Sequence, residues 1–320
     1  MFAALIFACF LFSSLAFQTN SLPPVPLQIN QPWGFQLRLL HTIHSIHNNC
    51  PENAQTTLVT QLSFNRINRL VLQSERWGGP ISAAIAVNSE QQFNDTISIL
   101  SSQPFVCLDI TIVPLDKKER LPLNSLRNLA LELVKTPYIL STDVDLLPCP
   151  KGVGETLSGK KDVALILPAF EMNILGPVPN SKEGLVSAVQ EKRVVPFKYK
   201  CKNCHGMTNY NKWFFSSSEY LVKHTSINAE PYFIIDRTQM PKYDERFCYG
   251  YRNRVSNVWH IAQSKVKFVV SPNVWLIHLP HEQPTFINRL AKGCPGVEKT
   301  DLIELWERFQ REVMVYGISR

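Results

Sequence analysis

Two aspartates that follow a short apolar segment are the sharpest chemical feature of this sequence. Asp143 and Asp145 lie in Ser141–Pro148, directly after the apolar residues 138–140. A D-x-D at the end of a strand lies at the edge where open α/β sheets bind ligands. Two carboxylates one residue apart can place hard oxygen ligands on one divalent cation, which also holds a diphosphate. A turn with two solvated aspartates is the alternative, but the preceding strand and a second carboxylate-rich region downstream favour the metal site.

A histidine at the end of another predicted strand is a further candidate ligand. His278 closes the segment 274–278 and belongs to Ile277–His281, which reads IHLPH. Imidazole combined with carboxylates suits Mn²⁺, a cation of borderline softness. A lone histidine at a strand end is usually an ordinary hydrogen-bonded side chain, so the D-x-D is what makes His278 a metal-ligand candidate.

Adjacent acidic residues between aromatic residues form the third candidate. Asp244 and Glu245 follow Tyr243 and precede Arg246. A carboxylate held among aromatic side chains can have a raised pKa that suits general-base catalysis. A loop ion pair between one of these carboxylates and a neighbouring arginine fits the spacing about as well.

Two other clusters are interpreted as structural. Cys201–His205 reads CKNCH, which superficially matches c-type haem attachment or half of a zinc site, but disulfide formation is the better interpretation. His41, His44 and His47 have helical spacing without a carboxylate near them in sequence, and we expect them at the surface. No P-loop, GxGxxG or GxSxG motif supports nucleotide hydrolysis, dinucleotide redox chemistry or serine hydrolysis.

The elements that must position these residues alternate between strands and helices. Strands are predicted over 81–87, 105–113, 138–140, 162–170, 232–235, 267–270 and 274–278, and helices over 90–101, 124–135 and 301–316, with Asn124 as an N-cap. This alternation predicts one α/β domain with a mostly parallel central sheet and helices on both faces.

Composition sets the class of protein. The chain has 320 residues, of which 45% are hydrophobic and 18% charged, so it can bury a sizeable core. Its net charge of +7 is spread along the chain, and no basic stretch is interleaved with stacking aromatics, so we expect no nucleic-acid partner. A basic cleft for an anionic ligand remains open.

The N-terminus predicts the compartment. Residues 1–17 are uncharged and apolar, shorter than the roughly 20 residues of a membrane span, and they resemble a signal peptide or a short type II signal-anchor. Residues 18–31 are proline-rich and read as a stem, and 32–320 as the catalytic domain. Contact with a membrane is expected only through the N-terminal segment. Seven further cysteines, an odd number, predict disulfides with at least one free thiol, and Asn94 opens the one glycosylation sequon.

Several segments, in this order, resemble glycosyltransferase family 49, which has a β1,4-glucuronyltransferase branch and a LARGE-type branch. The matching segments are Asn124–Ala130, Thr136–Pro148, Leu167–Glu171, Pro196–Trp213, Glu230–Tyr232, Tyr243–Phe247, Gly250–Arg254 and Ile277–His281. The similarity runs from about Pro80 to near the C-terminus. It implies a GT-A fold, in which a Rossmann-like nucleotide-sugar half is merged with an acceptor half, and an inverting enzyme that uses Mn²⁺ and a UDP-sugar.

Carried over by residue, the resemblance assigns roles to the motifs. Asp143 and Asp145 match the family's metal-binding D-x-D, and His278 matches the histidine that completes the metal shell. Arg127 and Asn128 match an R-N pair beside the nucleotide, so the donor-binding set is Arg127, Asn128, Asp143 and Asp145.

On the acceptor side the resemblance assigns Glu230 and Asn253. The base that deprotonates the acceptor hydroxyl is predicted to be Asp244, which lies in a D-x-R-F block, with adjacent Glu245 as the alternative. In-line attack would give a β-linkage from an α-linked donor.

The predicted activity is therefore transfer of a sugar, with glucuronic acid favoured, to a xylose- or galactose-terminated glycan during glycoprotein synthesis. The alternatives are a β1,3-N-acetylglucosaminyltransferase and a non-catalytic glycan-binding member of the family. The expected location is the Golgi lumen, or outside the cell if the N-terminal segment is cleaved, as a monomer or in a homo- or hetero-oligomer.

Overall fold

The structure of the chain is a computed structural model that describes residues 27–28, 38–39, 41–104, 107–115, 121–198, 204–223, 228–247, 252–281 and 299–316. The predicted signal segment 1–17 and residues 18–26 of the predicted stem lie outside these ranges. Within the predicted stem, strand β1 (Leu27–Gln28) pairs antiparallel with β2 (Arg38–Leu39), which lies in the predicted catalytic domain. Within the described ranges, no helix combines the length and the hydropathy that crossing a membrane would require.

The larger of the two main sheets has nine strands in the order β12-β14-β9-β13-β7-β4-β5-β6-β3. Their bounds are β3 Thr42–His47, β4 Thr56–Ser63, β5 Ile81–Val87, β6 Cys107–Pro114, β7 Tyr138–Ser141, β9 Val163–Leu167, β12 Tyr220–Leu221, β13 Tyr232–Asp236 and β14 Lys267–Val270. Strands β7, β4, β5 and β6 are parallel, as predicted. The rest of the sheet is mixed, because β13 lies antiparallel between β7 and β9.

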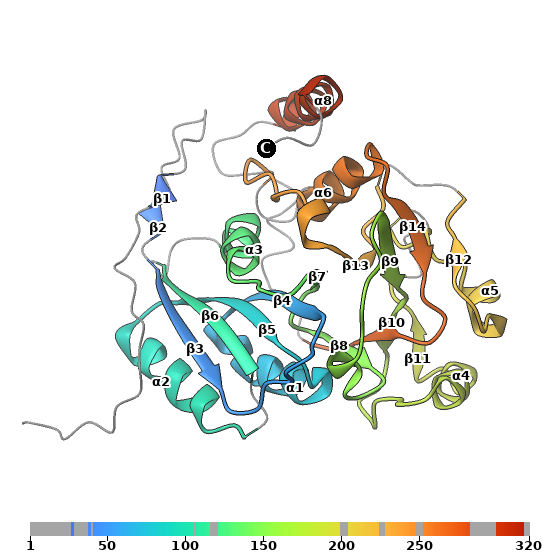
Figure 1. Ribbon diagram of the computed structural model, residues 1–320, viewed down its shortest axis with the longest axis horizontal. Coiled ribbons are helices and arrows are strands. Elements are labelled where there is room, and N and C mark those ends of the chain that lie inside the picture. Colours follow the sequence, from blue (N-terminus) through green and yellow to red (C-terminus); the bar gives the residue numbers. More distant parts are fainter. Residues whose placement is uncertain are drawn as a thin grey trace, which may run out of the picture.

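Helices cover both faces of the parallel half (Figure 1). Helices α1 (Ile67–Trp77) and α2 (Glu90–Ser101) pack against the face that carries Ile81, Ala83 and Ile85 of β5, whereas α3 (Leu123–Glu132) packs against the face that carries Ala84 and Ala86. Every residue of β5 is therefore buried, which agrees with a sequence that is apolar except for Ser82, whose hydroxyl donates to the Ala130 carbonyl.

A second sheet of four strands runs in the order β11-β10-β15-β8. Its strands are β8 Leu146–Cys149, β10 Ala169–Met172, β11 Val194–Pro196 and β15 Trp275–His278. The predicted strand 162–170 is divided at Pro168 into β9 and β10, one in each sheet. Proline has no backbone N–H for a sheet ladder, so the chain leaves one sheet there and enters the other.

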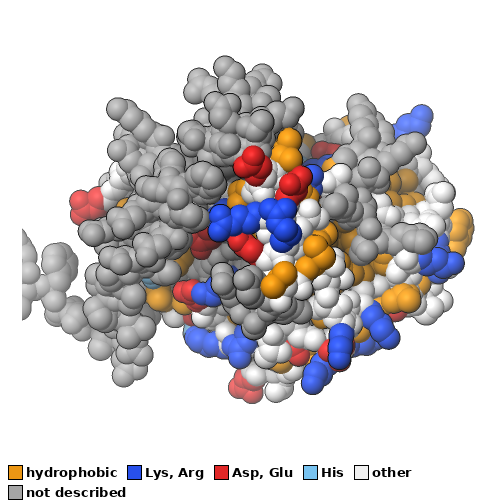
Figure 2. All heavy atoms as spheres, turned by 90° about the horizontal axis from the view of Figure 1, so that it is seen from above, with side chains coloured by type: hydrophobic (Ala, Val, Ile, Leu, Met, Phe, Trp, Pro, Cys, Tyr) orange, Lys and Arg blue, Asp and Glu red, His pale blue; other side chains and the backbone are white. Residues whose placement is uncertain are grey.

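The remaining helices surround the C-terminal half. They are α4 (Lys182–Gln190), α5 (Tyr210–Phe215), α6 (Asn253–Ala262) and α8 (Lys299–Tyr316), with 3₁₀ turns at Phe64–Arg66, Val153–Glu155 and Arg237–Gln239. Helix α8 packs on α6 through a separate aromatic cluster that includes Phe247, Trp306 and Phe309. The face of the molecule in Figure 2 shows Lys and Arg side chains directly beside Asp and Glu side chains, so the described part of that face mixes both signs of charge.

Two local predictions were wrong. Asn124 is not the N-cap of α3, which begins after Pro122, because the Asn124 amide instead donates to backbone carbonyls of the 244–253 region. The three histidines expected at the surface are not all there: His41 is buried and His44 is half-buried, and only His47 of the three is exposed.

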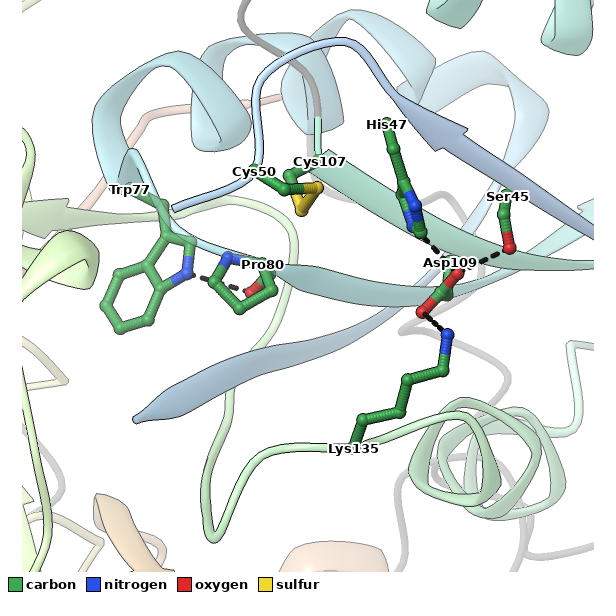
Figure 3. Close-up of a disulfide and its surroundings, with 8 residues drawn as sticks. All are labelled: Ser45, His47, Cys50, Trp77, Pro80, Cys107, Asp109 and Lys135. Atoms are coloured by element: carbon green, nitrogen blue, oxygen red, sulfur yellow. Dashed lines mark hydrogen bonds and ion pairs between the residues drawn. A yellow bond between two sulfur atoms is a disulfide. The ribbon is translucent and has the colours of Figure 1, made fainter. Parts of the chain in front are cut away.

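A disulfide between Cys50 and Cys107 ties the end of β3 to the beginning of β6 (Figure 3). Beside it, Asp109 contacts His47 and Lys135 on one surface of the sheet edge. Cys149 is a buried free thiol, as the odd cysteine count predicted. Asn94 is exposed on α2, whereas Thr96 of its sequon is buried and donates to a backbone carbonyl of the same helix.

Candidate active site

The D-x-D forms the connection between the two sheets, from the carboxyl end of β7 to the start of β8. Its backbone is fixed by hydrogen bonds from the Thr142 N–H to the Val59 carbonyl (2.9 Å) and from the Leu146 N–H to the Asp143 carbonyl (3.1 Å). Gln73 of α1 donates its side-chain amide to the carbonyls of Asp143 and Leu146. The two carboxylates therefore project from a rigid turn at the end of a parallel strand, as the sequence predicted.

Asp143 lies between two buried arginines. Its Oδ1 accepts hydrogen bonds from Gln61 (2.9 Å), Arg127 (3.1 Å) and Arg254 (2.9 Å), and its Oδ2 accepts one from the Tyr232 hydroxyl (2.9 Å). Burial alone would raise the pKa of Asp143, but the guanidinium groups of Arg254 and Arg127 outweigh this effect and hold it well below its usual range. Asp143 is therefore a permanently ionised carboxylate with one lone pair of Oδ2 still available.

Asp145 is held by one arginine from the 3₁₀ turn before α1, by one from α1 and by the segment after β15. Arg66 Nη1 lies 2.7 Å from Oδ1 and Arg69 Nε lies 3.8 Å from the same oxygen. His281 Nε2 lies 3.6 Å from Oδ2, and the Leu279 N–H donates to the Asp145 carbonyl at 2.9 Å. The HLPH segment is thereby brought against the D-x-D, which joins two motifs more than 130 residues apart.

His278 pairs in register with Leu146, the residue that follows Asp145. Burial, followed by the neighbouring His281 ring, lowers the pKa of His278 to about 4. The imidazole is therefore neutral at pH 7, so one ring nitrogen carries a proton and the other keeps a lone pair for a ligand.

The side chains of the D-x-D and His278 are of the kinds that bind a divalent cation, although their ligand atoms are not yet close enough together to form a complete site. The ligand atoms of Asp143, Asp145 and His278 do not all lie within 4.8 Å of one another. Among the described residues, that distance is met only by His47, Cys50 and Cys107, whose two sulfurs are joined in a disulfide. The neutral imidazole of His278, the ionised Asp143 and the carboxylate of Asp145 are nevertheless nitrogen and oxygen donors that suit Mn²⁺.

Of the predicted nucleotide-side pair, only Arg127 faces the D-x-D. The Asn128 amide donates to the Tyr243 carbonyl (2.9 Å) and to Glu245 (2.8 Å), and its oxygen accepts from the Tyr243 N–H. Arg127 also donates to Asn124, which orients the guanidinium toward Asp143. In this structure the Asn128 side chain anchors the 243–245 loop to α3, and its contact with the donor stays a prediction.

The two predicted bases both have protein partners. Arg246 Nε lies 3.0 Å from each oxygen of Asp244, and Arg246 in turn pairs with Glu312 of α8. The Glu245 oxygens accept from Ser125 (2.7 Å) and from the Asn128 amide. The loop ion pair that was the alternative interpretation is what the structure contains, so Asp244 and Glu245 anchor a loop, and a general-base role has no support from this geometry.

The two residues predicted on the acceptor side differ in their exposure to solvent. Glu230 is partly exposed and pairs with Lys198 at 3.0 Å. Asn253 is buried as the first residue of α6, where its side-chain oxygen accepts from the Arg254 N–H. Glu230 is therefore partly open to solvent, whereas the Asn253 side-chain oxygen is used at the start of α6, and the acceptor-side roles of both stay predictions.

Apart from Arg127, sequence reasoning missed the side chains that contact Asp143, which are Gln61, Tyr232 and Arg254. Arg254 contacts it across 111 residues of sequence, and its guanidinium stacks over the Tyr232 ring at 4.5 Å. The ring of His205, from the CKNCH segment, also stacks with the Tyr232 ring, and the two ring centroids are 5.8 Å apart. Cys204 is disulfide-bonded, so it is not available for a haem thioether. An arginine among apolar residues of a helix was the one signal for Arg254, and it was not used.

A Rossmann-like parallel half that ends at a D-x-D, joined to a second sheet that supplies a histidine, is the arrangement of a GT-A glycosyltransferase. The family described as glycosyl-transferase for dystroglycan matches residues 111–285. This chain belongs to that family. The matched range contains Arg127, the D-x-D, Arg254 and His278.

Individual relatives agree with the family. The chain is 31% identical to xylosyl- and glucuronyltransferase LARGE2s of Gallus gallus over 280 residues, covering 82% of this chain and 36% of the relative. It is 29% identical to LARGE1 of Homo sapiens, covering 77% and 34%. The chain therefore spans about a third of the length of these relatives. Among solved structures, it is similar to GalNAc-T7 with UDP, GalNAc and Mn²⁺, with a TM-score of 0.45, 11% identity and coverage of 81% of this chain and 49% of that one.

Proposed function

We propose that this chain is an inverting, Mn²⁺-dependent glycosyltransferase that moves a sugar from a UDP-sugar to a glycan in β-linkage. Glucuronic acid is the favoured sugar, and a xylose- or galactose-terminated glycan of a glycoprotein is the acceptor. The names of the relatives, xylosyl- and glucuronyltransferases, support sugar transfer and include the glucuronyl group among the groups transferred. We place the enzyme in the Golgi lumen, or outside the cell if its N-terminal segment is removed.

The charge around the D-x-D is the observation that carries the proposal. Two carboxylates are contacted by four guanidinium groups, two on each: Arg127 and Arg254 on Asp143, and Arg66 and Arg69 on Asp145. A surplus of positive charge in a partly buried site is costly unless an anion enters it. A nucleoside diphosphate, and the carboxylate of glucuronic acid, supply such anions.

The chain's own residues would share the work in three ways. Asp145, His278 and the remaining lone pair of Asp143 would hold the cation, which neutralises charge on the departing diphosphate. Arg127 and Arg254 keep Asp143 ionised and oriented. Because Asp244 and Glu245 are occupied by loop contacts, we do not assign the proton acceptor to either.

UDP release tests the proposal. The full chain is incubated with Mn²⁺, a β-xyloside acceptor and either UDP-glucuronic acid or UDP-N-acetylglucosamine, with EDTA as the control. Release that needs both acceptor and metal, and that is faster with UDP-glucuronic acid, is the expected result. Faster release with UDP-N-acetylglucosamine would change the donor. No release with either donor, from a protein that binds the glycan, would favour a binding member of the family.

Variants locate the site. Asp145→Asn and His278→Ala should each lower metal-dependent turnover by at least about 100-fold, because each removes one ligand from the proposed set. Lys160→Gln, which removes an exposed surface ion pair, is the matched control and should be unaffected. Full turnover in Asp145→Asn would contradict the metal site.

A further inference from the structure

Glu171 and His278 are paired neighbours on adjacent strands. Strands β10 and β15 are parallel, and their register sets Glu171 beside His278, which in turn is paired with Leu146. Successive side chains of a strand alternate between the two faces of a sheet. Ala169 and Leu276, two residues before Glu171 and His278, belong to the same core cluster, so Glu171 and His278 project from one face of the four-stranded sheet.

The Nδ1 atom of His278 is buried and has no hydrogen-bond partner. Among the described acidic residues, Glu171 is the one that forms an ion pair with His278: its Oε1 lies 3.8 Å from this atom. A movement of about 1 Å would bring these two atoms to hydrogen-bond distance. A buried polar atom without a partner is unfavourable, so the protein gains by closing this contact.

Glu171 also stands apart from the other carboxylates near the site. Those carboxylates are bound by arginine, lysine or amide groups; they are Asp143, Asp145, Glu230, Asp244 and Glu245. Within the described ranges, the Glu171 side chain makes no hydrogen bond, and it is 34% exposed. Its carboxylate is therefore free to accept a hydrogen bond from the His278 ring.

We propose that Glu171 is a positioning residue for His278: its carboxylate accepts the Nδ1–H of the imidazole, which leaves the Nε2 lone pair for the divalent cation. The inference rests on the proposed function for the identity of that cation. A carboxylate that accepts the second ring N–H of a metal-binding histidine fixes both the tautomer and the ring orientation.

Metal binding gives the first test. Mn²⁺ affinity of the full chain with UDP present is measured from the electron paramagnetic resonance of free Mn²⁺. Glu171→Ala should weaken Mn²⁺ binding about 10- to 100-fold, the usual effect of removing such a partner. Glu171→Gln should retain affinity within about 3-fold, because the Gln side-chain oxygen accepts the same hydrogen bond. Glu183→Ala, an exposed carboxylate on α4, removes the same charge and should bind like the wild type.

Two outcomes of this test would overturn the inference. Wild-type affinity in Glu171→Ala would show that His278 needs no partner. Normal Mn²⁺ affinity with abolished turnover in Glu171→Gln would make Glu171 a candidate proton acceptor in the reaction and not a positioning residue.

The tautomer gives a second test that needs no metal. In ¹⁵N-histidine-labelled, metal-free protein, long-range ¹H–¹⁵N spectra should show His278 protonated at Nδ1, with His278→Ala used to assign its signals. Glu171→Ala should lose that preference. Protonation at Nε2 in the wild type would overturn the inference even if Mn²⁺ binds. A wild type that shows Nδ1–H but binds no Mn²⁺ would instead refute the metal site of the proposed function, and with it the role of the free Nε2.

Discussion

The disulfide between Cys50 and Cys107 should stabilise the fold without contributing to catalysis. Cys107 begins β6, whereas the D-x-D lies at the other, carboxyl end of the parallel strands. The bond closes a loop with a sequence separation of 57 residues. In the chain-entropy account, a loop of that length removes about 14 cal/mol/K from the unfolded chain, or about 4 kcal/mol at 25 °C. Unfolding entropy of about 2.1 cal/mol/K per residue converts this loss into a Tm lower by about 6 °C.

Three variants measure this effect by urea unfolding: Cys50→Ala, Cys107→Ala and the double variant. Because either single substitution already opens the loop, all three should lose about the same 4 kcal/mol. Turnover of each variant at a temperature where it remains folded should equal that of the wild type. Losses that add in the double variant would show that side-chain packing, and not loop closure, is responsible. A loss below about 1 kcal/mol would refute the entropic reasoning altogether.

Three further predictions follow from other contacts. Glu312→Gln, which breaks the pair between α8 and the 243–247 loop, should lower stability at pH 7, whereas Glu307→Gln on the exposed side of α8 should not. The hydrogen bond from its arginine partner lowers the Glu312 pKa, so its contribution should be present above the usual 4.5 and be lost as the pH falls below that value; equal differences between wild type and Glu312→Gln at pH 7 and pH 3 would contradict this. Arg254→Lys should reduce kcat/KM about 100-fold in the UDP-release assay, since one ammonium cannot make both guanidinium hydrogen bonds, and an unchanged value would exclude a positioning role. Asn94→Gln should remove one glycan from protein secreted by a eukaryotic host, seen as a smaller mass loss on glycosidase treatment, and an identical loss in both proteins would disprove glycosylation there.

Much of the parallel half could be predicted, because its signals are local. The run Ile81–Val87 and the helix Glu90–Ser101 are found with the predicted bounds. A strand buried on both faces reads as continuously apolar, and Ser89 caps the helix that follows. The C-terminal half was less predictable, since β13 lies antiparallel between β7 and β9, and no local pattern sets the direction of a strand relative to distant neighbours.

The same contrast between local and distant signals applies to the candidate site. The sequence could place Asp143, Asp145 and His278 near one another, because the two aspartates follow an apolar strand and His278 ends another, and strand ends in an α/β sheet gather at a common edge. Their protein partners were not found. The pairing of Asp244 with Arg246, although local, could not be separated from a free base on spacing alone, and Asn128 was assigned to the donor although it holds the 243–245 loop.

The position of the D-x-D between two sheets has a consequence for how the site is assembled. Asp143 follows β7 of the larger sheet, while Asp145 precedes β8 of the smaller sheet, whose neighbour β15 carries His278. The proposed ligands can therefore be brought together only when both sheets are folded and docked. Gln73 of α1 serves this docking, because its amide donates to the carbonyls of Asp143 and Leu146, which lie on the two sides of the junction. Cation binding should accordingly report on the packing of the whole domain and not on the D-x-D tripeptide alone.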